Sequence, residues 1–284
     1  MDNIRDNNTK IALMYDFDKT LCVKNMQEFG FIPDLNMQVD DFWDEVRTLS
    51  HSAKMDSVLA YMYLMVKKSA EKNTPIKRDV LTMAGRDVEF YNGLDTWFGR
   101  INNFAESLGA TVEHYVISSG LKEIIQGTTI ANEFKEIYAC EFLYDDKGNA
   151  IWPVTAVNYT NKTQFVYRIN KGVLDVSNDE DLNRSTPDDS KRIPFNNMVY
   201  IGDGLSDVPC MKTVKMYGGT SIAVYDNMTD RVADLLSKNR VDFIYPADYT
   251  QDSGLEITIK NIIRKIVVSQ NLFNENKRQL ASNN

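Results

Sequence analysis

Short apolar segments that alternate with helical patterns restrict the folds open to this chain of 284 residues. Six segments have the length and composition of buried strands, at residues 10–17, 111–118, 136–142, 198–201, 220–225 and 241–245. The clearest helical pattern, residues 94–108, places Leu94, Trp97 and Ile101 on one face before Gly109 ends it. Strands that alternate with helices form parallel sheets. We therefore expect an α/β fold with a doubly wound, mainly parallel sheet.

Residues 22–91 interrupt this alternation, because their patterns are all helical and the segment is too long for a simple crossover between two strands. Its best helix, residues 54–70, carries methionines and other apolar residues along one face, which core packing explains better than a ligand-binding surface. We interpret the segment as an inserted α-helical cap domain. The catalytic core would then comprise residues 1–21 and 92–284. Core packing is also the expected role of the aromatic residues of the cap, which include Phe29, Phe31, Trp43, Tyr61 and Tyr63.

Composition and charge exclude several functional classes. The net charge is −8, from 32 basic and 40 acidic residues, and no block of five basic residues offers a surface for nucleic acid. No apolar run approaches the roughly 18 residues that a membrane span needs, and the first residues lack the apolar region of a signal peptide. The three cysteines, Cys22, Cys140 and Cys210, show no CxxC spacing. We expect a cytoplasmic protein with no nucleic-acid or membrane partner.

Two carboxylates and a hydroxyl follow the first expected strand, in the sequence Asp16-Phe17-Asp18-Lys19-Thr20. Alternate residues at the end of a strand can surround one point, so one carboxylate can attack a substrate while the other transfers protons. An isolated acidic cluster at a strand end is more often a solvated turn. The other motifs of the chain favour the catalytic interpretation here.

Small and basic residues stand at two later positions where a phosphate could bind. Ser118-Ser119-Gly120 ends the second expected strand, and its hydroxyl and backbone N–H groups can approach a phosphate. Lys162 begins a helical stretch, where its ammonium group could neutralise a bound phosphate. Neither feature is specific by itself, because short serine-glycine sequences and surface lysines are common.

A second pair of carboxylates, Asp203 and Asp207, follows the expected strand at residues 198–201 within the sequence Gly-Asp-Gly-Leu-Ser-Asp. This is not a dinucleotide-binding fingerprint, because an aspartate stands where the last glycine belongs, and the chain has no P-loop lysine motif. Carboxylates without histidine or cysteine partners suit a hard cation, and we predict Mg²⁺. The two histidines, His51 and His114, are expected to be structural.

The order of these motifs resembles that of the haloacid dehalogenase (HAD) superfamily of aspartate-nucleophile phosphatases. DxDxT comes first, SSG follows a second strand, a lysine comes next, and GDxxxD follows a later strand. The matching elements span Asp16 to Asp207, about two-thirds of the chain, and some members of the superfamily carry a cap where this chain has one. The pattern is most similar to the phosphoserine-phosphatase-like hydrolases. The resemblance implies a HAD-like Rossmannoid core and a phosphatase.

The resemblance also implies a role for each residue of the first motif. Asp16 attacks phosphorus to give an aspartyl-phosphate, and Asp18 protonates the leaving oxygen and later activates water. Thr20 helps to position Asp18 and is counted among the substrate-binding residues. Lys162 is catalytic, because it bridges the phosphate and Asp16.

Ligand-binding roles fall to the remaining matched positions. Ser118, Ser119 and Gly120 are expected to hold the phosphoryl oxygens of the substrate. The resemblance assigns Mg²⁺ to four aspartates, of which Asp18 contributes its carbonyl group and Asp207 orients the metal shell. The four expected metal residues are Asp16, Asp18, Asp203 and Asp207.

Several departures and alternatives concern the substrate and the reaction. Asp18 argues against dehalogenation as the reaction, because dehalogenating members of the superfamily lack a carboxylate two residues after the nucleophile. Phosphoserine phosphatases carry a glutamate nine residues after the nucleophile to meet the substrate's ammonium group, whereas this chain has Asn25. We expect a small phosphorylated metabolite as substrate and make no prediction of the oligomeric state. The alternatives are a phosphotransferase or mutase with the same intermediate, and a non-catalytic regulatory protein of this fold.

Overall fold

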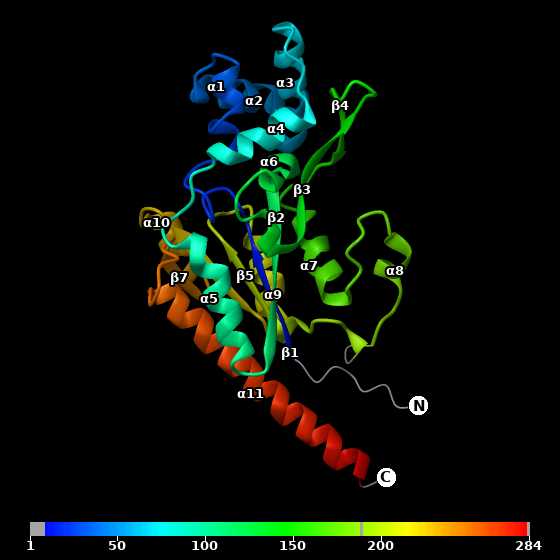
Figure 1. Ribbon diagram of the computed structural model, residues 1–284, viewed down its shortest axis with the longest axis vertical. Coiled ribbons are helices and arrows are strands. Elements are labelled where there is room, and N and C mark those ends of the chain that lie inside the picture. Colours follow the sequence, from blue (N-terminus) through cyan, green and yellow to red (C-terminus); the bar gives the residue numbers. More distant parts are fainter. Residues whose placement is uncertain (1–8, 188–189, 283–284) are drawn as a thin grey trace.

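A seven-stranded sheet forms the centre of the computed structural model, which describes residues 9–187 and 190–282. The strand order is β4-β3-β2-β1-β5-β6-β7 (Figure 1), and every neighbouring pair is parallel except β3 and β4. The strands are β1 (Thr9–Tyr15), β2 (Ala110–Leu121), β3 (Phe134–Tyr144), β4 (Ala150–Thr155), β5 (Met198–Gly202), β6 (Thr220–Tyr225) and β7 (Phe243–Pro246). This architecture confirms the expected α/β fold with a mainly parallel sheet.

Helices cover both faces of the sheet, because the chain first adds strands on one side of β1 and later adds the rest on its other side. β2 lies on one side of β1 and β5 on the other, so right-handed crossovers place their helices on opposite faces. On one face α5 packs against α11, and on the other α7 packs against α9. The helices of the core are α5 (Leu94–Glu106), α6 (Lys122–Gln126), α7 (Lys162–Lys171), α8 (Asp179–Asn183), α9 (Val208–Met216), α10 (Asp230–Ser237) and α11 (Gly254–Ser282). Short 3-10 turns lie at η1 (Met26–Glu28), η2 (Gly85–Asp87), η3 (Ala131–Glu133) and η5 (Phe195–Asn197).

The central strands are apolar along most of their length because helices bury both of their faces. Residues 11–15 of β1 and 198–202 of β5 are all buried. All six expected strands are present, with ends that differ by a few residues. The antiparallel edge strand β4 was not predicted, because three of its six residues are exposed and Pro153 interrupts its apolar pattern.

The inserted segment forms a helical cap beyond the carboxyl ends of the parallel strands, at the top of Figure 1. Its helices are α1 (Phe31–Asp34), α2 (Val39–Ala53), α3 (Ser57–Glu71) and α4 (Arg78–Ala84). The expected helix at 54–70 begins later, at Ser57, because the Asp56 side chain caps the N–H groups of Val58 and Leu59. The cap belongs to the observed fold, whereas the domain boundaries at residues 21/22 and 91/92 stay a prediction. Within the described residues, no helix combines the length and apolar character needed to span a membrane.

His114 is held in the core by a chain of hydrogen bonds. Trp97 Nε1 donates to the Tyr15 hydroxyl at 3.0 Å, and this hydroxyl lies 3.1 Å from His114 Nδ1. Because Nε2 of the neutral ring faces an amide oxygen and carries the proton, Nδ1 accepts from the Tyr15 hydroxyl. His114 Nε2 then donates to Asn102 Oδ1 at 3.0 Å. Both ring nitrogens are satisfied in the neutral form, and burial lowers the pKa of His114 to about 3.

This histidine should make the protein less stable as the pH falls. Below about pH 6.5 the unfolded chain binds a proton on His114 that the folded chain does not bind. His114 therefore lowers the free energy of unfolding by about 1.4 kcal/mol for each unit by which the pH falls. In urea unfolding, wild type should therefore lose about 2 kcal/mol more between pH 6.5 and pH 5 than His114→Gln does. His51→Gln, which removes an exposed histidine, is the control and should retain the wild-type dependence. Parallel curves for wild type and His114→Gln would contradict this account.

Candidate active site

The predicted site residues gather where the carboxyl ends of β1, β2 and β5 meet. Asp16 directly follows β1, and Asp203 directly follows β5. The Asp16 N–H donates to the Ile201 carbonyl at 2.9 Å, which ties the two strand ends together. Parallel strands place their carboxyl ends along one edge, so residues far apart in the sequence become neighbours there.

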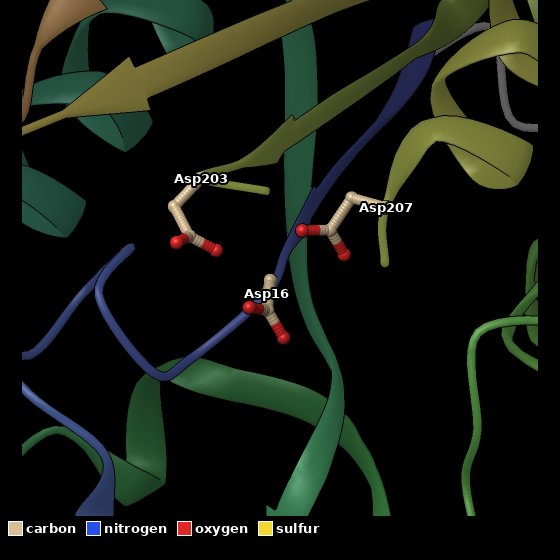
Figure 2. A group of neighbouring side chains, drawn as sticks. All are labelled: Asp16, Asp203 and Asp207. Atoms are coloured by element: carbon tan, nitrogen blue, oxygen red, sulfur yellow. The ribbon is translucent and has the colours of Figure 1, made fainter. Parts of the chain in front are cut away.

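Three carboxylates form the centre of the site (Figure 2). Asp16, Asp203 and Asp207 each contribute one oxygen to a group whose atoms all lie within 4.8 Å of one another. Asp16 is 5% exposed and Asp207 is fully buried. Burial, reinforced by the charge of Asp207, raises the pKa of Asp16 to about 6. Burial and the charges of the other two carboxylates raise the pKa of Asp203 to about 8. Crowding and burial therefore make it unfavourable for all of these carboxyl groups to be charged at once.

Lys162 is the cation that holds two of these carboxylates. Its Nζ lies 2.8 Å from Asp16 Oδ1 and 2.8 Å from Asp207 Oδ1, although it is 146 residues from Asp16 in the chain. Only 1% of the lysine is exposed. Burial opposes its charge, but the two carboxylates outweigh this effect and hold the pKa of Lys162 above its ordinary value. The structure thus places this lysine, the first residue of α7, beside the predicted nucleophile.

Asp207 is fixed by two further donors. The buried Tyr200 hydroxyl donates to Asp207 Oδ1 at 2.8 Å, and the Gly204 N–H reaches Oδ2 at 3.4 Å. A Cβ atom at Gly202 would lie 2.6 Å from Oδ2, so glycine is required there. Sequence analysis missed Tyr200, because a tyrosine inside a buried strand has the pattern of a core residue. Its only signal was a hydroxyl-bearing side chain shortly before the Gly-Asp motif.

Asp18 lies next to the carboxylate cluster but is not one of its members. Its Oδ1 accepts a hydrogen bond from the Met26 N–H at 2.9 Å, and the Cys22 thiol is 3.7 Å away. Burial, together with the charge of Asp16, raises the pKa of Asp18 to about 7. The next residue, Lys19, has a left-handed backbone conformation, with φ of 58°, which bends the chain sharply after Asp18. An acid with this pKa can both give and take a proton at neutral pH.

Thr20 is fully buried, but the structure does not pair it with Asp18. Its Oγ1 has no hydrogen-bond partner among the described residues. Its carbonyl accepts a hydrogen bond from the Tyr249 hydroxyl at 2.7 Å, which anchors the loop to the core. The observed contacts with Asp18 come instead from Met26 and Cys22, which sequence analysis did not select for the site. Positioning of Asp18 by Thr20 stays a prediction.

The Ser118-Ser119-Gly120 segment lies beside Asp18. Ser118 Oγ accepts a hydrogen bond from the Gly120 N–H at 3.0 Å. A Cβ atom at Gly120 would lie 3.2 Å from Asp18 Oδ2 and only 2.1 Å from Met26 Cε, so any side chain at this position would have to displace the end of the Met26 side chain. Tyr61 also reaches the segment, and its hydroxyl donates to the Ser119 carbonyl at 2.8 Å. Sequence analysis assigned Tyr61 to core packing, and no local pattern indicates a contact across 58 residues.

A match to a family model agrees with this geometry. Residues 13–212 match the model described as haloacid dehalogenase-like hydrolase, and this range includes every predicted site residue. A protein of Borreliella burgdorferi that is described as uncharacterized is 28% identical over 274 residues, which cover 86% of this chain and 93% of that protein.

Solved structures of hydrolases share the fold at low sequence identity. A HAD family hydrolase from Salmonella enterica serovar Typhi has a TM-score of 0.60 and 15% identity, over 90% of this chain and 71% of that one. A phosphoserine phosphatase solved as an analogue of its phospho-aspartyl intermediate has a TM-score of 0.53 and 14% identity, over 89% of this chain and 99% of that one. A probable phosphoserine phosphatase from Vibrio cholerae has a TM-score of 0.58 and 12% identity, over 94% and 69%. Because the family model covers most of the chain, the protein belongs to the haloacid dehalogenase-like hydrolases.

Proposed function

We propose that the protein is a phosphatase that hydrolyses a small phosphomonoester with Mg²⁺ and through an aspartyl-phosphate intermediate. The observation that carries this proposal is the buried Lys162, which joins Asp16 to Asp207 at the centre of a carboxylate cluster. The proposed nucleophile, Asp16, and its countercharge therefore meet in this cluster, and the proposed proton donor, Asp18, lies beside it. Membership of a hydrolase family supports the proposal.

In the proposed reaction Asp16 and Asp18 divide the chemistry between them. A carboxylate oxygen of Asp16 bonds to phosphorus, the bond from phosphorus to the ester oxygen breaks, and Asp18 gives its proton to that oxygen. Water then attacks phosphorus, the bond to Asp16 breaks, and Asp18 takes up the proton that the water loses. With a pKa of about 7, Asp18 is about half protonated at neutral pH and can serve in both steps.

The other predicted site residues would hold the phosphoryl group. The Lys162 ammonium would neutralise a phosphoryl oxygen as charge develops, which is the main task of a protein in phosphoryl transfer. Ser118 Oγ and the N–H groups of Ser119 and Gly120 would donate to the other oxygens. The Thr20 hydroxyl, which has no partner among the described residues, is available to orient this loop.

The donor set fits Mg²⁺, because it offers carboxylate oxygens crowded enough to repel one another. Asp16, Asp203 and Asp207 would hold the ion, with the Asp18 carbonyl as a further oxygen ligand. When bound, the cation supplies positive charge that offsets the repulsion between the carboxylates and a phosphate dianion.

A small phosphorylated metabolite is the proposed substrate class. Solved phosphoserine phosphatases share the fold, one of them described as a substrate-bound complex. Asn25 takes the position where the resemblance to phosphoserine phosphatases led us to expect a glutamate, and its amide donates to the Glu28 carboxylate. Because position 25 departs from the expected glutamate, we treat phosphoserine as one candidate substrate among related phosphomonoesters.

Replacing the proposed nucleophile should abolish turnover. Asp16→Asn keeps the side-chain shape but removes the attacking carboxylate, so phosphate release from an aryl phosphate should fall on the order of 10³-fold or more. The variant should still fold, as measured by circular dichroism. Asp146→Asn, an exposed aspartate in the turn between β3 and β4, is the control and should keep full activity. Retained activity in Asp16→Asn would exclude an aspartyl-phosphate at this position.

A different outcome concerns the wild-type protein. Transfer of phosphate from the ester to an added hydroxyl compound would indicate a phosphotransferase.

Replacing Asp203 should weaken metal binding. Asp203→Asn removes one negative oxygen ligand, so the dissociation constant for Mg²⁺, measured by calorimetry without substrate, should rise by about tenfold or more. The matched control is Asp226→Asn, because Asp226 follows β6 as Asp203 follows β5 but is exposed. Equal Mg²⁺ affinity in wild type and Asp203→Asn would argue against the proposed metal site.

A further inference from the structure

A single hydroxyl group of the cap reaches the proposed phosphate-binding segment. Tyr61 lies on α3 and is 4% exposed, and its ring packs edge-on against Trp43 of α2, with centroids 6.1 Å apart. From there its hydroxyl donates to the Ser119 carbonyl, at 2.8 Å. The proposed reaction does not use this buried tyrosine. Its hydroxyl nevertheless joins the inserted segment to the core next to Asp18.

The Ser119 carbonyl shares a rigid unit with an N–H group of the site. The carbonyl of Ser119 and the N–H of Gly120 belong to the same planar trans peptide and point in opposite directions. Holding the carbonyl therefore sets the direction of the N–H. That N–H now donates to Ser118 Oγ at 3.0 Å, beside Asp18. A glycine peptide without such an anchor has more backbone freedom than any other.

The same carbonyl is held from the core as well. The Cys140 thiol, on β3, donates to it at 3.3 Å and itself accepts from the Val157 N–H at 3.2 Å. One anchor thus belongs to the sheet, and the stronger one belongs to the cap. The Tyr61 anchor comes from the cap itself, so it depends directly on how the cap packs on the core.

We propose that Tyr61 is a positioning residue for phosphate binding. It fixes the Ser119 carbonyl and so holds the Gly120 N–H, and the Ser118 hydroxyl that accepts from it, in place for a phosphoryl oxygen while the cap is packed on the core. Phosphate binding and packing of the cap on the core are then coupled, and each should favour the other. This inference rests on the proposed function of the site, and it assigns the cap a part in binding phosphate itself.

The test is Tyr61→Phe, which removes the hydroxyl and keeps the ring against Trp43. Loss of one hydrogen bond should weaken inhibition by inorganic phosphate, measured with Mg²⁺ present, by about three- to tenfold. The KM for an aryl phosphate should rise by a similar factor, while kcat changes less. Tyr63→Phe is the control, because Tyr63 lies on the same helix but is 51% exposed, and it should match wild type.

A second variant tests the same carbonyl without altering the cap. Cys140→Ala removes the weaker donor and should reduce phosphate affinity about twofold. The double variant should lose more than the product of the two single effects, because each donor partly compensates for the other.

The outcomes separate this inference from the proposed function. Wild-type hydrolysis with unchanged phosphate inhibition and KM in Tyr61→Phe would overturn the role of Tyr61 alone. A wild-type protein that neither hydrolyses phosphate esters nor binds phosphate, as measured by calorimetry with Mg²⁺, would overturn both. Weaker phosphate binding in Tyr61→Phe, with Tyr63→Phe unchanged, would support the role of Tyr61 even if wild type failed to hydrolyse the esters tested.

Discussion

The burial of the Lys162 ammonium group is the constraint on which the rest of the site depends. A charge that is 1% exposed is costly unless opposite charges hold it, and both Asp16 and Asp207 lie 2.8 Å from its Nζ. Those two carboxylates and Asp203 still exceed the lysine in charge, which is why burial and mutual repulsion raise the pKa of Asp16 and Asp203. One lysine therefore does not offset the mutual repulsion of three carboxyl groups that lie together.

The sheet and the cap each supply part of this arrangement. Parallel pairing of β1 with β2 and with β5 places three strand ends side by side, and α7 brings Lys162 to the same edge. The inserted segment covers this edge, where the Met26 N–H contacts Asp18. Desolvation by this cover strengthens every charge interaction beneath it. Burial, together with the charge of Asp16, raises the pKa of Asp18 to about 7.

Local patterns predicted the elements whose residues repeat in a regular way. Apolar strands such as β1 and β5 were recognisable, because burial on both faces requires continuous apolar side chains. The edge strand β4 was not, because exposed residues and Pro153 remove that signal. Helix α3 begins three residues later than its periodicity suggested, since the Asp56 side chain satisfies the first N–H groups and defines the start.

By itself, the sequence determined the types of chemical group and their order along the chain. Asp16 and Asp203 could be placed at a common edge because both follow buried strands of one parallel sheet. The order of the motifs also pointed to Lys162, but only the tertiary structure showed that its Nζ lies between Asp16 and Asp207. Only the structure joined Tyr200 to Asp207 and Tyr61 to the Ser119 carbonyl. These contacts depend on side chains from separate elements meeting across as many as 146 residues. Periodicity reports which face of an element is buried, but not which partner that face will meet.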